Sequence, residues 1–255
     1  MENNTKDRIN VAQFGVGYWG PNLLRNLISN PRFNVRTVVD LSEARRDFVK
    51  NIYPGIQLDS TPEAVFENPN IDAVVIATPV ATHYDLAIRA VKSGKHVLVE
   101  KPMATRVEDV KNIGRVATEK NVTAMVGHTF LFNQAVRYVK GLIDEGELGD
   151  IRYIYSQRVN LGRIRNDVDA LWNLAPHDVS IIQYWLGDPN PRSISKIGMD
   201  YVQKGINDVV FLNVSYPNKV MAHIHVSWLD PHKVRKITVV GSKKMVVYDD
   251  LAENK

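Results

Sequence analysis

Cysteine is absent from all 255 residues of this sequence. Its absence excludes disulfide bonds, a thiolate nucleophile and cysteine-based metal sites, and it fits a reducing compartment. Long apolar runs are missing too: no stretch approaches the roughly 18 apolar residues that a membrane span needs. The N-terminal MENNTKDRIN also lacks the apolar core of a signal peptide. We therefore expect a cytoplasmic protein that does not associate with a membrane.

Charge of one sign is not concentrated anywhere in the chain. The 32 lysines and arginines exceed the 28 aspartates and glutamates by only four, and they are scattered. Nucleic-acid-binding proteins show a basic stripe or a known module, so nucleic acid is not an expected partner. His223 and His225 alternate along a predicted strand, but no third ligand has suitable spacing, and we predict no metal site.

A glycine-rich turn lies near the start of the chain. An apolar run at residues 9–14 ends at Gly15, and Gly17 and Gly20 follow in G-x-G-x-x-G spacing before Pro21 opens an amphipathic helix. Between a strand and a helix, this spacing is typical of dinucleotide binding, because the helix start presents N–H groups and positive charge to a pyrophosphate. The residues expected to hold the cofactor here are Gly15, Gly17, Tyr18, Trp19 and Gly20.

An acidic residue stands where such a site needs one. The apolar run 35–39 ends in Asp40, twenty residues beyond Gly20. A carboxylate there accepts hydrogen bonds from the adenosine ribose and repels a 2′-phosphate, so we predict NAD as the cofactor and NADP as the lesser alternative. Arg45 would offset this preference if its side chain turned toward the ribose.

Strand and helix patterns alternate through the first half of the chain. Apolar runs such as residues 73–77 are typical of parallel strands covered on both faces. Pairs with capping-box spacing, Ser60 with Glu63 and Thr105 with Glu108, predict helix starts. We therefore predict a doubly wound α/β Rossmann domain with a parallel sheet over residues 1–127.

The pattern changes near Gly127. Helices are predicted at residues 135–145 and 176–186, and successive strand-like runs with tight turns follow from residue 193 onward. Consecutive strands joined by short turns indicate an antiparallel sheet. We predict an α+β domain with a mostly antiparallel sheet over residues 128–255.

Two residues carry the chemistry expected beside a nicotinamide. Lys101 follows the strand in HVLVEKP, at the carboxyl edge where open parallel sheets bind ligands. Its ammonium would stabilise a developing alkoxide or relay a proton there, although a surface lysine at a strand end is the plainer interpretation. His177, in LWNLAPHDVSII, lies near the first turn of a predicted helix and would accept a hydroxyl proton, unless it only packs or caps. Asn173 shares its face if the helix begins early.

A local cluster of arginines follows in QRVNLGRIR. Arg158, Arg163 and Arg165 would grip a pyrophosphate or a carboxylate on the substrate by bidentate hydrogen bonds. The alternative is a solvated loop with no role in recognition.

These segments together resemble the Gfo/Idh/MocA oxidoreductases, the glucose–fructose oxidoreductase and inositol dehydrogenase family. The likeness extends over nearly the whole chain and is closest to the nucleotide-sugar members. It rests on the segments GVGYWG, ATPVATHYDLA, HVLVEKPMA and LWNLAPHDVSI, together with Asp40.

The resemblance implies a function for each half. The N-terminal domain would bind the dinucleotide, and the C-terminal domain would bind substrate and form homodimers or homotetramers through its sheet. Lys101 and His177 would be catalytic and bind substrate, together with Asn173, which stands where many members have aspartate. Cofactor contacts near the nicotinamide and its ribose are implied for Thr78, Pro79, His83, Glu100 and Lys101.

Two departures from the family pattern bear on activity. Asparagine at position 173 is not a base, so Lys101 and His177 must suffice for the proton. Typical members also continue beyond the point that corresponds to Lys255, so the C-terminal domain is expected to be short or truncated. We predict an NAD-dependent sugar dehydrogenase, acting on a nucleotide-activated sugar. The alternatives are a free-polyol or inositol dehydrogenase and a non-catalytic dinucleotide-binding protein.

Overall fold

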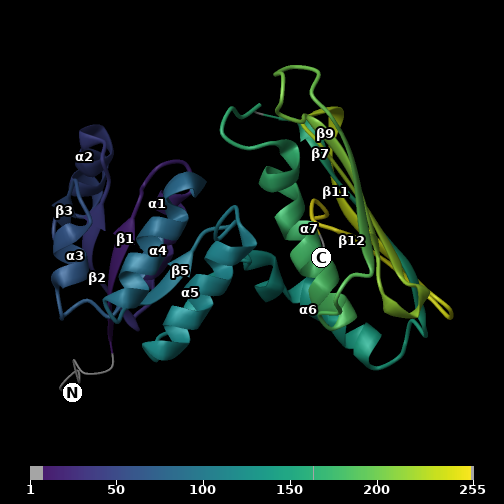
Figure 1. The fold of residues 1–255 in the computed structure, drawn as a ribbon, viewed down its shortest axis with the longest axis horizontal. Coiled ribbons are helices and arrows are strands. Elements are labelled where there is room, and N and C mark those ends of the chain that lie inside the picture. Colours follow the sequence, from purple (N-terminus) through teal and green to yellow (C-terminus); the bar gives the residue numbers. More distant parts are fainter. Residues whose placement is uncertain (1–7, 163, 254–255) are drawn as a thin grey trace. The chain divides into compact units, whose positions relative to one another are not determined.

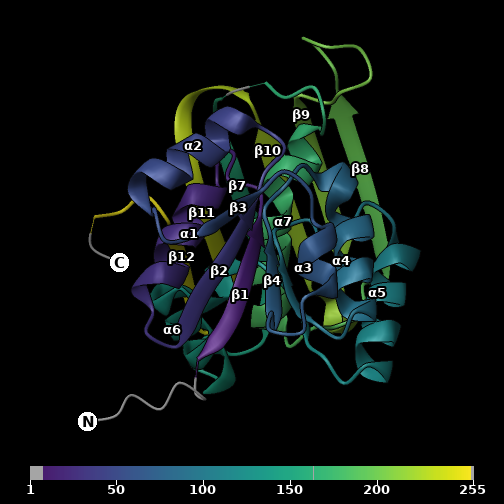
Figure 2. The same cartoon turned by 90° about the vertical axis from the view of Figure 1, so that its left-hand side faces the viewer.

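The computed structural model describes residues 8–162 and 164–253, and it divides the chain into two units between Gly127 and His128. Unit 1, which ends at Gly127, contains a parallel sheet. Its strands are β1 (Ile9–Phe14), β2 (Phe33–Val39), β3 (Gln57–Asp59), β4 (Ala73–Ile76), β5 (His96–Val99) and β6 (Ala124–Val126). They lie in the order β3-β2-β1-β4-β5-β6, with β1 between β2 and β4 (Figure 2).

Helices cover both faces of the unit 1 sheet. Neighbouring residues on a strand point to opposite faces, and Val38 and Val39 accordingly belong to two separate buried clusters. Val38 packs with Leu24 of α1, and Val39 belongs to the same cluster as Ile113 of α5. The helices are α1 (Gly20–Ser29), α2 (Glu43–Ile52), α3 (Glu63–Glu67), α4 (His83–Lys92) and α5 (Val107–Glu119).

Unit 2 begins at His128 and is built on a mixed, mostly antiparallel sheet. Its strands are β7 (Ile151–Leu161), β8 (Ser193–Met199), β9 (Val209–Ser215), β10 (Met221–Ser227), β11 (Leu229–Gly241) and β12 (Met245–Asp249). They lie in the order β12-β11-β7-β10-β9-β8. The pair of β7 and β10 at the centre is parallel, and every other recorded pair is antiparallel.

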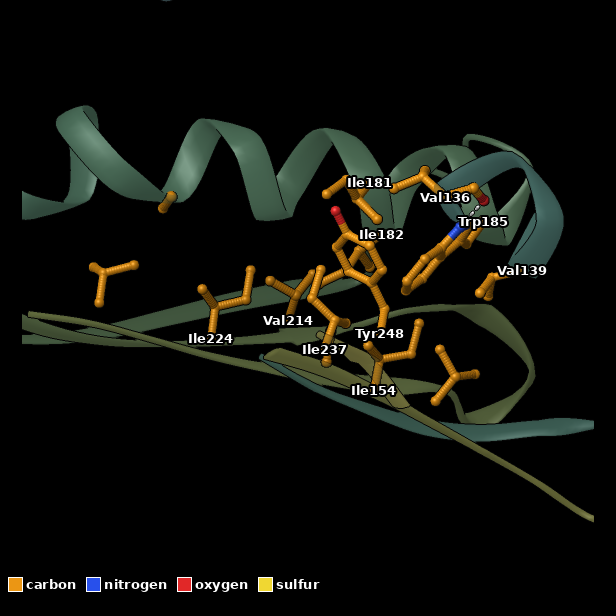
Figure 3. Close-up of a cluster of buried hydrophobic side chains, with 14 of the residues drawn as sticks. Val136, Val139, Ile154, Ile181, Ile182, Trp185, Val214, Ile224, Ile237 and Tyr248 are labelled. Atoms are coloured by element: carbon orange, nitrogen blue, oxygen red, sulfur yellow. Dashed lines mark hydrogen bonds between the residues drawn. The ribbon is translucent and has the colours of Figure 1, made fainter. Parts of the chain in front are cut away.

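Two helices, α6 (Gln134–Asp144) and α7 (Ala170–Leu186), pack on one face of this sheet (Figure 1). Figure 3 shows the buried layer between α7 and the strands, in which the Trp185 indole donates a hydrogen bond of 2.8 Å to the Val136 carbonyl. Successive residues of a strand face opposite sides of the sheet. Along β10, Ile224 is buried against the helices, whereas Met221, three residues away on the opposite face, is 52 % exposed. The face away from the helices therefore carries apolar side chains at the surface.

Several local expectations differ from the structure. Helix α7 begins at Ala170, six residues before the predicted start, because the Asp169 carboxylate caps it by accepting from the Trp172 amide at 2.9 Å. The predicted capping boxes are wrong, since α3 and α5 begin after Pro62 and Arg106 without a side-chain cap. Among the helices of the described chain, none has the length and apolar character needed to cross a bilayer.

Candidate active site

The strand order of unit 1 brings several predicted site residues to one edge of the sheet. The chain leaves β1 toward β2 on one side, and it later places β4 on the other side of β1. Open parallel sheets bind ligands at such a switch point, outside the carboxyl ends of the strands. The glycine turn follows β1, Asp40 follows β2, and Lys101 lies just beyond β5, so all three lie at this edge.

The first and third glycines are required by the shape of the turn. Gly15 has a φ of +86°, and a Cβ added there would lie 2.7 Å from the Ala77 carbonyl oxygen. A Cβ added at Gly20 would lie 2.4 Å from the Gly15 carbonyl oxygen. Any side chain at either position would displace backbone, because real Cβ atoms do not approach a carbonyl oxygen so closely. These two glycines allow the turn to fold tightly against the start of α1.

Gly17 serves a different purpose. A Cβ added there would have no atom of the protein within 4 Å, so the protein alone does not require glycine at this position. Helix α1 starts just beyond, with Pro21 in its first turn and no acidic residue there. The open space beside Gly17 and the positive helix end are what a pyrophosphate requires, and the turn therefore fits a dinucleotide.

Gln13 was not singled out from the sequence, yet it supports the turn. This side chain is completely buried within β1, and its Nε2 donates to the carbonyls of Gly15 at 3.0 Å and Gly20 at 2.8 Å. The amide therefore links both ends of the turn. The sequence signal for its role was a polar residue between the apolar Ala12 and Phe14 in the second half of β1.

Asp40 occupies the predicted position and also shapes the turn. Its Oδ2 accepts from the Val16 amide at 2.8 Å, and its Oδ1 accepts from the Ser42 amide at 2.9 Å. A carboxylate has about four acceptor positions, so capacity remains for ribose hydroxyls. Arg46 donates through Nη1 to the Asp40 and Leu41 carbonyls, at 2.6 and 3.0 Å.

The turn after β4 carries Thr78 and Pro79. The Thr82 hydroxyl donates to the Pro79 carbonyl at 2.8 Å and lies 2.7 Å from the Thr78 hydroxyl. Because one hydroxyl has one hydrogen, Thr78 is the donor in the second bond. His83 is 2 % exposed, and its two ring nitrogens face the carbonyls of Thr78 and Pro102.

Glu100 and Lys101 follow β5 directly. Burial raises the pKa of the Glu100 carboxyl, while the Lys101 amide, which donates to it at 3.2 Å, and the charge of Lys101 act in the opposite direction. The Trp19 side chain also donates a hydrogen bond to this carboxyl. Trp19 thus connects the glycine turn to the turn that carries Lys101, while the neighbouring Tyr18 is 90 % exposed.

In unit 2, α7 carries the other predicted catalytic residues. Asn173 and His177 are four residues apart within α7, so they lie on one face of the helix, as expected for an early helix start. His177 lies in the middle of the helix rather than near its first turn, which corrects the expectation. The Asn173 Oδ1 accepts from the Trp228 indole at 3.3 Å, and the His177 ring packs edge-on against Phe130 at 5.0 Å.

The structure places Arg158 differently from the substrate-binding position predicted for it. It lies in β7 rather than in a loop, its side chain is 2 % exposed, and it forms a buried ion pair with Asp178. Its Nε and Nη2 donate to the two carboxylate oxygens at 2.8 and 3.1 Å, and the guanidinium lies 4.9 Å from the Phe130 ring. The guanidinium fork is committed to Asp178, so the predicted grip on a substrate anion does not fit. Arg165 also pairs with an acid, since its Nε donates to the Asp167 carboxylate at 2.8 Å, but both of these side chains are exposed.

Arg163 lies outside the described residues. Within unit 1 the structure brings together the glycine turn, Asp40, Glu100 and Lys101, and within unit 2 it brings together Asn173 and His177. Lys101 and His177 belong to different units, so their joint action on one substrate stays a prediction.

The glycine turn, the acid after β2 and the strand order define unit 1 as a dinucleotide-binding Rossmann fold. Residues 9–128 match the family model described as "Oxidoreductase family, NAD-binding Rossmann fold", and residues 136–247 match the GFO/IDH/MocA C-terminal domain. The chain therefore belongs to the Gfo/Idh/MocA family, which confirms the resemblance, the fold class and the NAD-binding character of unit 1.

Three comparisons show the range of similar proteins. The chain is 31% identical to the NADP+-dependent scyllo-inositol 2-dehydrogenase of Bacillus subtilis, over 66% of this chain and 47% of that protein. It is 27% identical to the 2,7-anhydro-N-acetylneuraminate hydratase of Escherichia coli, over 84% of this chain and 60% of that protein. The structure of GenD2 from gentamicin A biosynthesis, in complex with NAD, superposes with a TM-score of 0.89 at 23% identity, covering 95% and 72% of the two chains. The chain thus spans about half to three fifths of the length of the Bacillus subtilis and Escherichia coli relatives.

Proposed function

We propose that this protein is an NAD-dependent oxidoreductase that transfers hydride between the nicotinamide and a hydroxyl or keto group of a sugar or polyol. The observation that carries the proposal is the common edge in unit 1 at which the open Gly17 turn, Asp40 and Lys101 lie. Membership of the oxidoreductase family and the polyol dehydrogenase among its relatives support it.

Each predicted catalytic residue has a defined task in this proposal. NAD+, held by the glycine turn and Asp40, would supply the acceptor for a hydride from the substrate carbon. The Lys101 ammonium stabilises the negative charge that develops on the substrate oxygen, where a charged donor lowers the barrier most. His177 accepts the hydroxyl proton, so that one hydride and one proton leave the alcohol and a ketone remains. Asn173, bonded to the Trp228 indole, orients the substrate by hydrogen bonding rather than by accepting a proton.

Free polyols or sugars stand ahead of nucleotide-activated sugars as substrates. Arg158, which was expected to help grip a pyrophosphate or a carboxylate on the substrate, is instead held in a buried ion pair with Asp178. The inositol dehydrogenase among the relatives also favours a free polyol. A nucleotide-activated sugar is the second candidate, supported by the resemblance of the sequence to the nucleotide-sugar members of the family.

Thermal unfolding in the presence of candidate ligands distinguishes these substrates. A ligand that binds only the folded protein raises Tm, with about 2.7 kcal/mol of stabilisation at one hundred times its Kd. With NAD present, we expect inositols or free sugars to raise Tm and to be oxidised with formation of NADH. A rise with UDP- or dTDP-sugars alone would instead support the second candidate.

Turnover measurements on Lys101→Ala test the proposed role of the lysine. We expect kcat to fall at least a hundredfold while the Kd for NAD+ changes little, because the ammonium acts on the substrate oxygen. Equal losses in kcat and in the affinity for NAD+ would contradict the proposed role of Lys101 at the substrate oxygen. If NAD+ binds tightly and no sugar or polyol exchanges hydride, the protein is a non-catalytic dinucleotide-binding protein.

Cofactor choice and assembly complete the proposal. NAD is preferred over NADP because the Asp40 carboxylate repels a 2′-phosphate and the neighbouring Arg46 is bonded to backbone carbonyls. Titration of the protein with NAD+ and with NADP+ measures the ratio of the two Kd values and so tests this preference.

The apolar side chains on the outer face of the unit 2 sheet support a homodimer or homotetramer, and light scattering in solution tests this expectation.

A further inference from the structure

His83 has a hydrogen-bond arrangement that a neutral histidine does not satisfy. Its Nδ1 lies 2.7 Å from the Pro102 carbonyl oxygen, and its Nε2 lies 2.8 Å from the Thr78 carbonyl oxygen. A carbonyl oxygen only accepts, and a neutral imidazole carries only one N–H. In either neutral tautomer, one ring nitrogen would therefore turn its lone pair toward a carbonyl lone pair.

The burial of His83 makes this mismatch costly. The side chain is 2 % exposed, so bulk water does not separate a nitrogen from its carbonyl at these distances. A buried polar atom without a proper partner destabilises the fold, whereas hydrogen bonds from a charged donor are stronger than neutral ones. The imidazolium, with two N–H groups, satisfies both carbonyls.

Charged groups around the ring act in both directions. Glu100, on the turn after β5, interacts electrostatically with His83 and favours the cation. Asp85, two residues further along α4, is exposed and does not share the face of His83. Lys101 and the N-terminal end of α4, where His83 is the first residue, oppose it. Tyr84 of the same helix bonds to Asn112 on α5 through its hydroxyl at 2.8 Å. The partly buried carboxylate of Glu100 is the charge that compensates an imidazolium here.

We propose that His83 is a positioning residue that, protonated on both ring nitrogens, ties the Thr78 carbonyl to the Pro102 carbonyl. These two carbonyls belong to the turns after β4 and β5, which carry Thr78 and Pro79 on one side and Lys101 on the other. Through these bonds, His83 fixes the distance between the two turns at the carboxyl edge of the sheet. The consequence for hydride transfer rests on the proposed function, but the bridge itself does not.

Nuclear magnetic resonance on protein labelled with 15N in its histidine rings tests the bridge directly. We expect one ring of the seven histidines to show two N–H groups at pH 7.5, in the protein without added cofactor. His83→Gln should remove both N–H signals.

His96 is the matched control in the same unit, because its Nδ1 accepts from the Thr123 amide at 3.0 Å and must therefore lack a hydrogen. If His83→Gln does not fold, substitution of the other histidines one at a time assigns the signals by elimination. A single N–H on His83 at this pH overturns the proposal.

Kinetics test whether the bridge positions Lys101. We expect His83→Gln to lower kcat by roughly tenfold or more, since at least one charged hydrogen bond is lost. The substrate for this measurement is the sugar or polyol that the thermal unfolding experiment identifies. Both ring nitrogens of His83 face protein carbonyls and are not available to the cofactor, in contrast to the contact that the family resemblance implied. The Kd for NAD+ should therefore change less than about threefold, and exposed His96→Gln should resemble the wild type. An active enzyme whose kcat survives His83→Gln refutes the positioning role even if both N–H signals are present. A protein inactive on every substrate refutes only the proposed function, and the resonance experiment still decides on the bridge.

Discussion

Replacing Arg158 by methionine tests whether this arginine supports the fold or binds substrate. The side chains of Arg158 and Asp178 are 2 % and 1 % exposed, and two hydrogen bonds of 2.8 and 3.1 Å join them. Removing one partner of a buried ion pair leaves the other charge without compensation, at a cost of about 3–5 kcal/mol. The loss of the guanidinium over the Phe130 ring adds a smaller contribution, on the order of 0.5–2 kcal/mol.

Urea unfolding followed by tryptophan fluorescence measures this loss. Three of the four tryptophans, Trp172, Trp185 and Trp228, lie in unit 2, so the signal reports mainly on that unit. We expect Arg158→Met and Asp178→Leu each to destabilise unit 2, by about 3–5 kcal/mol. The double variant should recover most of the stability, because replacing both charges by apolar groups of similar volume is often nearly neutral.

The double-mutant cycle has a clear opposite outcome. If the losses of the two single variants add, the pair does not interact as the structure shows. If Arg158→Met unfolds like the wild type but raises KM for the substrate, the arginine contacts the substrate and is not committed to Asp178. In the expected outcome, the double variant retains a KM close to that of the wild type.

Two other predictions concern the glycine turn and Glu100. Gly20→Ala should lower Tm, since its Cβ would lie 2.4 Å from the Gly15 carbonyl oxygen, whereas Gly17→Ala should leave Tm unchanged and weaken NAD+ binding in calorimetry at least tenfold. Unchanged NAD+ affinity in Gly17→Ala would mean that the pyrophosphate does not approach this glycine. Burial raises the pKa of Glu100 above its ordinary 4.5, so the folded protein holds this proton more tightly than the unfolded chain does. The contribution of Glu100 to the free energy of unfolding therefore falls as pH rises from about 4.5 through the raised pKa, and it is constant above that pKa. The stability of Glu100→Gln relative to the wild type should accordingly increase over this window in urea titrations, and a decrease would contradict the assignment.

Elements with strong local patterns were predictable from the sequence. The glycine spacing, Pro21 and the acid at position 40 each have a local physical reason, and the strand–turn–helix at residues 9–29 forms as expected. Continuous apolar strands also identified the parallel sheet, because only strands covered on both faces are apolar throughout.

Contacts between distant segments were not predictable in the same way. Arg158 reads as part of a basic loop in the sequence, and only the length of β7 and the placement of Asp178, twenty residues later, make it an internal ion pair. Gln13 and His83 likewise bond to carbonyls of turns whose paths the sequence pattern does not fix. The start of α7 was missed because Pro176 suggested a first turn, whereas the Asp169 cap lies seven residues earlier.

The double duty of Asp40 limits how this protein can change its coenzyme during evolution or by engineering. The carboxylate that would discriminate between NAD and NADP also anchors the Val16 amide inside the glycine turn. A single exchange to a small neutral residue would admit the extra phosphate, yet it would release the loop that must receive the rest of the molecule. A successful switch therefore needs a second substitution that restores an acceptor for that amide, so the two changes have to arise together.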